Sequence, residues 1–256
     1  MIIIVKLEYH GRAYCGWQRQ IGQTTVQEVI EVSLSKLLKR TIDITGCGRT
    51  DTGVHAINYI AHFEGNQEDI IALNRKSINS ILPKDISVQN LYFCNGPFHS
   101  RFDAISRKYI YKLHTQKTSF NNDTSCFNER FASYNQTEFE TLSNLLLTQD
   151  NFKSFAKLHS SVENFNCKVQ QVIWIQKDDK NWEFHIAANR FLRGMVRLLV
   201  GTYFNLGTNK ISIDQIKFDL ENKAQITKAW SVPAHGLILV NVEYPQSISD
   251  LWVEIN

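Results

Sequence analysis

Residues 42–63 read IDITGCGRTDTGVHAINYIAHF, and this stretch decides how the first half of the chain folds. Its apolar residues alternate with polar ones on both sides of a glycine-rich centre, which predicts strands over Ile42–Gly46 and Ile57–Phe63. The segment CGRTDTGVH between them is then a loop. Its glycines permit tight turns and positive φ, so we expect Asp51 at the tip of a compact, stiff loop.

The elements around this stretch extend it to a β-α-β-β-α-β order. Ile2–Tyr9 alternates like a strand and ends at His10-Gly11-Arg12. An apolar stripe at i, i+3 and i+4 predicts a helix over Thr25–Leu38. A further helix over Asp69–Ser80 and a strand over Ile86–Phe93 complete the order.

The second half repeats the same order. The expected elements are a strand at Ile105–His114, a helix at Thr137–Leu147, strands at Val169–Lys177 and Trp182–Ala188, a helix at Phe191–Leu206, a short inserted helix near Ile213–Asn222 and a strand at Leu237–Tyr244. We therefore predict an α+β fold of two ferredoxin-like halves, with mainly antiparallel sheets joined side by side and helices on one face. Asn95-Gly96-Pro97 breaks the pattern, which places the boundary near Ser100 and gives halves of 1–100 and 101–256.

Composition excludes several classes of protein. The chain has 256 residues, of which 43% are hydrophobic and 21% charged, and it has no apolar run long enough to cross a bilayer. Disorder and a membrane-spanning role are therefore not expected, and the N-terminus resembles a first strand more than a signal peptide. Five scattered cysteines without a C-x-x-C pair argue against disulfides and a zinc cluster, and favour a reducing cytoplasm.

Positive charge is concentrated in two stretches. The whole chain has a net charge of only +3, which does not by itself indicate a nucleic-acid partner. Between Pro97 and Lys117, however, five cations accompany one acid, and Ala187–Arg197 adds three arginines and no acid. These cations are Arg101, Arg107, Lys108, Lys112, Lys117, Arg190, Arg193 and Arg197.

Asp51 has three possible interpretations. It can be a nucleophile or general base, or it can simply accept hydrogen bonds within its own turn, which is the commoner role of an Asp-Thr-Gly aspartate. Asp-Thr-Gly also marks aspartic proteases, which need two carboxylates sharing a proton. A single Asp-Thr-Gly would require a homodimer, Arg49 would oppose the shared proton, and the strong helices disagree with an all-β protease.

Two further segments combine cations with apolar or aromatic side chains. Strand alternation puts Arg107, Tyr109, Tyr111 and Leu113 on one face, which suits base stacking and phosphate pairing, or a half-buried sheet with solvated cations. In the predicted helix from Phe191, Arg193 and Arg197 lie along the edge of an apolar stripe. Such arginines either meet an anion or extend their heads into water. The histidines are not grouped at metal-ligand spacing, so no metal is expected.

Taken together, these segments resemble the TruA family of tRNA pseudouridine synthases, nearly from end to end. The stretches that carry the resemblance are Tyr9-His10-Gly11, Gly16-Trp17-Gln18-Arg19-Gln20, Thr25-Val26-Gln27, Gly48–Ala56, Arg107–Tyr111, Phe191–Arg197 and Pro233–Leu237. Several matches in the right order are more specific than any one motif. The resemblance favours catalysis over a purely structural role of each segment. It also favours catalysis over a non-catalytic RNA-binding module and over the protease.

The resemblance implies a reaction and a set of roles. Such an enzyme isomerises uridine to pseudouridine at positions 38, 39 and 40 of the tRNA anticodon stem-loop, as a homodimer and without cofactor or metal. Asp51 would be the essential carboxylate, Tyr109 would stack on the uracil, and Arg197 would be the partner of Asp51. Arg49 would fill the gap left by the flipped uridine. The other expected contacts to tRNA are Arg101, Arg107, Lys108, Tyr111, Arg190, Arg193 and Leu237.

Overall fold

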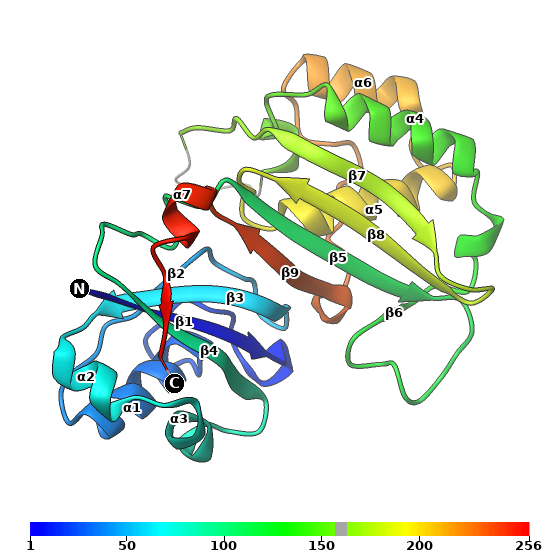
Figure 1. Ribbon diagram of the computed structural model, residues 1–256. Helices are drawn as coiled ribbons and strands as arrows, with labels where there is room; N and C mark the ends of the chain where they lie inside the picture. The colour runs from blue at the N-terminus through cyan, green and yellow to red at the C-terminus, as the bar shows by residue number, and fades with distance from the viewer. Residues whose placement is uncertain (157–162, 256) are drawn as a thin grey trace. The chain divides into compact units, whose positions relative to one another are not determined.

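The computed structural model describes residues 1–156 and 163–255 (Figure 1). Its internal contacts divide the chain into two compact units. Unit 1 consists of Met1–Ser106 together with Leu239–Asn256, and unit 2 consists of Arg107–Ile238. This division differs from the one expected from the sequence mainly at the C-terminal end, because the residues after Ile238 return to the first unit.

Unit 1 contains a ferredoxin-like arrangement. In chain order its main elements are β1 (Ile2–Tyr9), α1 (Val26–Leu38), β2 (Thr45–Gly46), β3 (His55–Glu64), α2 (Gln67–Ala72), α3 (Arg75–Ile81) and β4 (Ile86–Cys94). Strand β1 pairs antiparallel with both β3 and β4, and β2 pairs antiparallel with β3. The resulting order β4-β1-β3-β2 is that of a split β-α-β unit. The predicted α+β fold class is confirmed.

One face of this sheet carries the core of unit 1. Ile3, Val5 and Leu7 alternate along β1 and are completely buried, as are Ile30 and Leu34 of α1. Figure 1 shows α1, α2 and α3 gathered on one side of these strands. Helix α1 begins where the sequence predicts, because the hydroxyl of Thr25 accepts a hydrogen bond from the backbone N–H of Glu28 at 3.4 Å.

The single helix predicted over Asp69–Ser80 is wrong, because two caps divide it. Asn66 and Asp69 form a reciprocal capping box that begins α2, and the side chain of Asn74 caps the backbone N–H of Ser77 to begin α3. Leu73 lies between them in an extended conformation. An asparagine at each start therefore outweighs the continuous apolar periodicity.

The strand predicted over Ile42–Gly46 is shorter than expected and begins only at Thr45. Side chains of α1 take the place of a neighbouring strand before that point. The backbone N–H of Ile44 donates to Glu31 Oε1 at 3.1 Å, and its carbonyl accepts from Gln27 Nε2 at 3.0 Å. Because these groups are already paired, residues 42–44 join no strand ladder.

Unit 2 has its own sheet and helices. Its main elements are β5 (Ser106–His114, the first residue belonging to unit 1), β6 (Cys126–Phe127), α4 (Gln136–Leu147), β7 (Val169–Gln176), β8 (Asn181–Ala188), α5 (Met195–Gly207) and α6 (Ile213–Glu221). Strand β8 pairs antiparallel with β5 and β7, and β6 pairs parallel with β5. Figure 1 shows α4 and α6 running side by side. Between helices and sheet lies an aromatic core that includes Phe131, Phe139, Phe184 and Tyr203.

The long helix predicted from Phe191 begins four residues later, at Met195. Gly194 precedes it with φ of +72°, a left-handed conformation that an α-helix cannot contain. Phe191, Leu192 and Arg193 therefore form a separate segment before α5. Arg193 and Arg197 do not occupy successive turns of one helix, contrary to the prediction.

The chain ends in short elements. These are β9 (Leu237–Glu243), α7 (Gln246–Ser249) and β10 (Val253–Glu254). Elsewhere in the chain, short 3₁₀ helices lie at Gly11–Ala13, Phe131–Ser133, Lys153–Phe155 and Ala234–Gly236. Strand β10 pairs with β4 through Val253 and Glu254. None of the helices in the described part of the chain is long and apolar enough to span a bilayer.

Candidate active site

The loop that carries Asp51 is fastened by the N-terminal segment of unit 1. The Thr50 hydroxyl hydrogen-bonds the hydroxyl of Tyr9 at 2.8 Å, and its carbonyl accepts from the backbone N–H of Trp17 at 3.3 Å. Within the loop, the N–H of Val54 donates to the carbonyl of Asp51 at 3.1 Å. Thr50 is buried and Asp51 is half-buried, so a partly accessible carboxylate stands on a fixed backbone.

Two glycines of the N-terminal segment allow this close approach. A Cβ at Gly16, whose φ is +85°, would lie 2.3 Å from the carbonyl oxygen of Thr50. A Cβ at Gly11 would lie 2.0 Å from the carbonyl oxygen of Val54. Both distances are too short for any side chain. The glycines of Tyr9-His10-Gly11 and Gly16-Trp17-Gln18 are therefore required by the backbone of the Asp51 loop.

An aromatic pair also supports the loop. Trp17 stacks on Tyr59 of β3 with ring centroids 4.1 Å apart and planes at 26°, and the Tyr59 hydroxyl donates to the carbonyl of Gly48. The N–H of Cys47 donates to the carbonyl of Ile60 at 2.8 Å. These contacts hold the loop against β3.

Arg49 lies two residues before Asp51 in this loop. Its side chain is exposed and carries a positive charge. Its Nε donates to Gln18 Oε1 at 3.2 Å. The guanidinium is thus oriented by a side chain of the same N-terminal segment that fastens the loop. Arg49 and Asp51 share one rigid support.

In unit 2, β5 presents Tyr109 and Tyr111 differently. Tyr109 is half-buried, and its ring meets that of Phe191 edge to face, with centroids 5.3 Å apart. Tyr111 is fully buried, its hydroxyl donates to the carbonyl of Pro233 at 3.1 Å, and burial raises its pKa well above the ordinary value. The expected contact of Tyr111 with tRNA disagrees with this position, because the ring belongs to the core of unit 2.

Arg197 lies in the first turn of α5 and is held by the segment before β9. Its Nε donates to the carbonyl of Val232 at 2.7 Å, and its own carbonyl accepts from the N–H of Val232 at 3.3 Å. A Cβ at Gly236 would lie 2.7 Å from the ring of Tyr111, so Pro233–Leu237 packs closely on that ring. Leu237 is only 5% exposed and packs in the interior, which disagrees with its expected tRNA contact.

The remaining cations predicted to contact tRNA keep at least partial exposure. Arg101 and Arg193 are exposed, whereas Arg107, Lys108 and Arg190 are half-buried. Arg107 donates from Nη1 to the carbonyl of Asn189 at 2.6 Å. None of the five is enclosed in a core, so each retains a surface that an anion can reach.

The side chain of His99 holds a turn at Arg101, which the sequence did not indicate. Nδ1 of His99 accepts the backbone N–H groups of Arg101 and Phe102, each at 3.2 Å. The His99 ring stacks on Phe102, whose side chain is 73% exposed, and Arg101 lies over the Phe102 ring at 5.6 Å. Burial lowers the pKa of neighbouring His62 to about 4, so that imidazole is neutral at pH 7. The turn displays an aromatic ring and a cation together.

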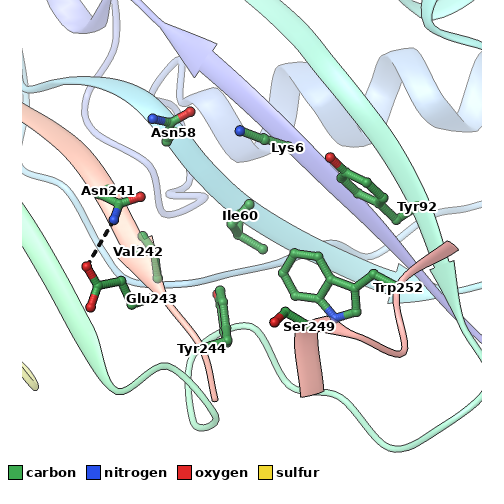
Figure 2. A pocket seen from close by; sticks show the side chains of 10 residues that line it. All are labelled: Lys6, Asn58, Ile60, Tyr92, Asn241, Val242, Glu243, Tyr244, Ser249 and Trp252. Atoms are coloured by element: carbon green, nitrogen blue, oxygen red, sulfur yellow. Dashed lines mark hydrogen bonds between the residues drawn. The ribbon is translucent and has the colours of Figure 1, made fainter. Parts of the chain in front are cut away.

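Unit 1 also contains a hollow of about 280 Å³ that includes none of the predicted site residues (Figure 2). Its walls come from β1, β3, β4 and the C-terminal segment, and include Lys6, Asn58, Tyr92 and Trp252. Glu243 on its rim accepts a hydrogen bond from Asn241 at 3.2 Å. Among residues 1–156 and 163–255, no group of three His, Cys, Asp or Glu side chains is arranged to hold a metal ion.

Comparison with known proteins relates this geometry to a family. A family profile described as tRNA pseudouridine synthase matches residues 6–103 and 144–245. The chain belongs to this family. The matched ranges contain Asp51 with its supporting segment and Arg197 with Val232, whereas Tyr109 lies between them.

Relatives in this family match almost the whole chain. Proteins named tRNA pseudouridine synthase A are 42% identical over 248 residues in Azobacteroides pseudotrichonymphae and 38% identical over 249 residues in Bacteroides fragilis. Each alignment covers 95% of this chain, with 97% and 96% of the respective relative. The relative from Porphyromonas gingivalis is 36% identical over 97% of this chain and 98% of its own length. Tyr109 and its strand thus fall within the extent of these family members.

Proposed function

We propose that this chain is an isomerase that converts uridine to pseudouridine in tRNA. The reaction breaks the N1–C1′ bond and forms a C5–C1′ bond. The hydrogen of C5 leaves as a proton and N1 takes up a proton, so the product is an isomer of uridine and no redox partner is needed. The observation that carries the proposal is a partly accessible Asp51 carboxylate on a loop that is fastened at Thr50, Gly48 and Cys47, inside a matched tRNA pseudouridine synthase region. A fixed carboxylate suits nucleophilic or general-base work on one ribose or base.

An assay of hydrogen loss from C5 tests this function directly. Unmodified tRNA transcribed with uridine tritiated at C5 releases tritium to water when C5 bonds to C1′. We expect release that saturates at a small whole number of uridines per tRNA. Binding of tRNA without any release would show a non-catalytic RNA-binding module instead.

The finer assignment of residues follows the resemblance and the geometry of each unit. We propose the anticodon stem-loop, at positions 38, 39 and 40, as the substrate region. Asp51 is the catalytic carboxylate, Tyr109 stacks on the uracil and serves the deprotonation at C5, and Arg49 occupies the gap left by the extruded uridine. The support is the half-exposed state of Asp51 and Tyr109 and the exposed state of Arg49.

Arg197 is proposed as the guanidinium partner of the Asp51 carboxylate. The variant Arg197→Lys keeps the charge but loses the planar fork and the Nε donor to Val232. We expect the single-turnover rate of pseudouridine formation to fall roughly 100-fold, since one preorganised donor at a reacting group contributes about this much. The dissociation constant for tRNA, measured by filter binding, should change less than threefold, about 0.7 kcal/mol.

Arg193→Lys is the matched control for this variant, because Arg193 is an exposed arginine four residues earlier, in the segment before α5. It keeps the positive charge for phosphate and should retain most of the rate. If both variants lose the rate equally, or if Arg197→Lys loses tRNA affinity and nothing else, Arg197 is a phosphate contact and not a partner of the carboxylate.

Binding of tRNA should depend strongly on salt, because the proposed contacts are cations near phosphates. They are Arg101, Arg107, Lys108, Arg190 and Arg193. The variant Lys108→Gln should reduce the slope of log affinity against log salt by about one, as expected when one phosphate contact is lost. Lys84→Gln, at an exposed lysine after α3, should leave the slope unchanged. An affinity that does not depend on salt would show that these cations do not contact phosphates.

We also propose that the protein acts in the cytoplasm as a homodimer. A second copy would extend the cationic surface beyond what one chain of net charge +3 offers, and all five cysteines are thiols, as in a reducing compartment. Light scattering of the purified protein should give a mass twice the 29.6 kDa of the chain.

A further inference from the structure

We propose that Gln18 and Gln27 are positioning residues that transmit the orientation of a buried carboxylate, Glu31, to the guanidinium of Arg49. The inference rests on the proposed function, because it concerns how Arg49 is prepared to act on tRNA. It is carried by a continuous chain of hydrogen bonds within unit 1 that runs from α1 to the residue two positions before Asp51.

The chain starts at a carboxylate that has little contact with water. Glu31 is only 4% exposed. Its Oε1 accepts from the N–H of Ile44 at 3.1 Å and from Gln27 at 2.9 Å, and its Oε2 accepts from Arg19 at 3.1 Å. A buried carboxylate with three donors is fixed in place, since losing any of them would leave the charge unsatisfied.

Glu31 determines which way the Gln27 carboxamide faces. The Nε2 of Gln27 donates both to Glu31 and to the carbonyl of Ile44, at 2.9 and 3.0 Å. Both of these partners are acceptors, so only the amino end of the amide fits there. The oxygen of Gln27 must therefore point the other way, where it accepts from the N–H of Arg19 and from Gln18 Nε2, each at 2.9 Å.

Gln27 in turn determines the orientation of Gln18. Because the Gln27 oxygen is an acceptor, only the amino end of Gln18 fits beside it, so Gln18 presents its Nε2 there and its Oε1 is left for another donor. That oxygen accepts from Arg49 Nε at 3.2 Å. The hydrogen bonds therefore allow only one orientation of the Gln27 and Gln18 amides. In this orientation the oxygen of Gln18 is available to the Arg49 guanidinium.

The contact uses Nε and not the terminal nitrogens of Arg49. An exposed arginine samples many rotamers, and ordering it when the substrate binds costs about 1.5–2 kcal/mol. Gln18 restricts the side chain in advance and leaves the two terminal amino groups outside this contact. Arg49 is then preorganised to insert beside an extruded uridine and need not be ordered at that moment.

Gln18→Met tests the inference, because methionine has a similar length and cannot accept the Arg49 hydrogen bond. We expect the single-turnover rate of pseudouridine formation to fall roughly tenfold, while the dissociation constant for tRNA changes less than twofold. The fall should be smaller on an anticodon stem-loop whose target uridine is already unpaired, because extrusion then costs less. If Gln18 had a purely structural role, the rate would fall equally on both substrates.

A double-mutant cycle separates positioning from damage to the loop. If Gln18 acts through Arg49, the added change Gln18→Met should have no further effect in an Arg49→Met background. Chemical unfolding of each variant reports any loss of stability. Equal tenfold losses in both backgrounds, or a loss that follows stability, would overturn the proposal.

Gln23→Met is the matched control, since Gln23 is an exposed glutamine of the same loop that bonds Cys15 and not the chain to Arg49. It should keep the wild-type rate. If the wild-type protein forms no pseudouridine, the proposed function fails. If the wild type is active and Gln18→Met equals it, the positioning role alone fails.

Discussion

The variant Asp51→Asn should form pseudouridine at least about 1,000-fold more slowly than the wild type, and the product should fall below detection in the tritium-release assay. Asparagine has nearly the same shape, but it can neither attack carbon nor accept a proton as a carboxylate does. The bonds that fasten the loop come from Thr50, Gly48 and the backbone of Asp51 and Cys47, so the exchange leaves them in place. The dissociation constant for tRNA should therefore change little.

Asp43→Asn is the control for this prediction. Asp43 is an exposed carboxylate of the same unit, eight residues before Asp51, and losing its charge should leave the rate unchanged. Substantial turnover by Asp51→Asn would remove Asp51 from the chemistry. A loss of tRNA binding equal to the loss of rate would make it a binding residue.

Much of the fold follows from local patterns in the sequence. Strand β1 has the predicted bounds, and α1 differs from its prediction only by the capping residue Thr25. Both are decided by alternation, helical periodicity and a cap, which are visible in a few neighbouring residues. The same holds for the Asp51 loop, whose glycines indicate a tight backbone.

The errors occur where side chains or single dihedral angles override these patterns. Residues 42–44 have strand-like alternation, yet Gln27 and Glu31 take the hydrogen bonds a neighbouring strand would need. Gly194 ends the helical pattern by its positive φ. No local pattern shows that the chain after Ile238 returns to unit 1, because pairing of β10 with β4 joins residues about 160 positions apart.

The candidate site divides in the same way. Alternation correctly groups Tyr109 and Tyr111 on one face of β5, but it cannot tell how deep each ring lies. That depth depends on Pro233 and Gly236, which approach Tyr111 from more than 120 residues along the chain. The chain of hydrogen bonds from Glu31 to Arg49 also could not be predicted from the sequence, because only the fold brings these side chains together.

The difference in burial between Tyr109 and Tyr111 separates a chemical role from a packing role. Tyr109→Phe removes a hydroxyl and keeps the ring that packs against Phe191, whereas Tyr109→Leu removes both. If the hydroxyl serves the deprotonation at C5, Tyr109→Phe should slow single-turnover formation of pseudouridine about 100-fold. Tyr109→Leu should slow it about tenfold more, because stacking on a base is worth about 1–3 kcal/mol.

Tyr111→Phe provides the matched control on the same strand, two residues away. It removes a hydroxyl that donates to Pro233 inside unit 2, so it should reduce the free energy of unfolding by about 1 kcal/mol and leave the rate nearly unchanged. A fully active Tyr109→Phe enzyme would show that the hydroxyl has no chemical role and that only stacking remains. A Tyr111→Phe enzyme as slow as Tyr109→Phe would instead trace both losses to disturbed packing of β5, since the buried ring has no surface to offer the uracil.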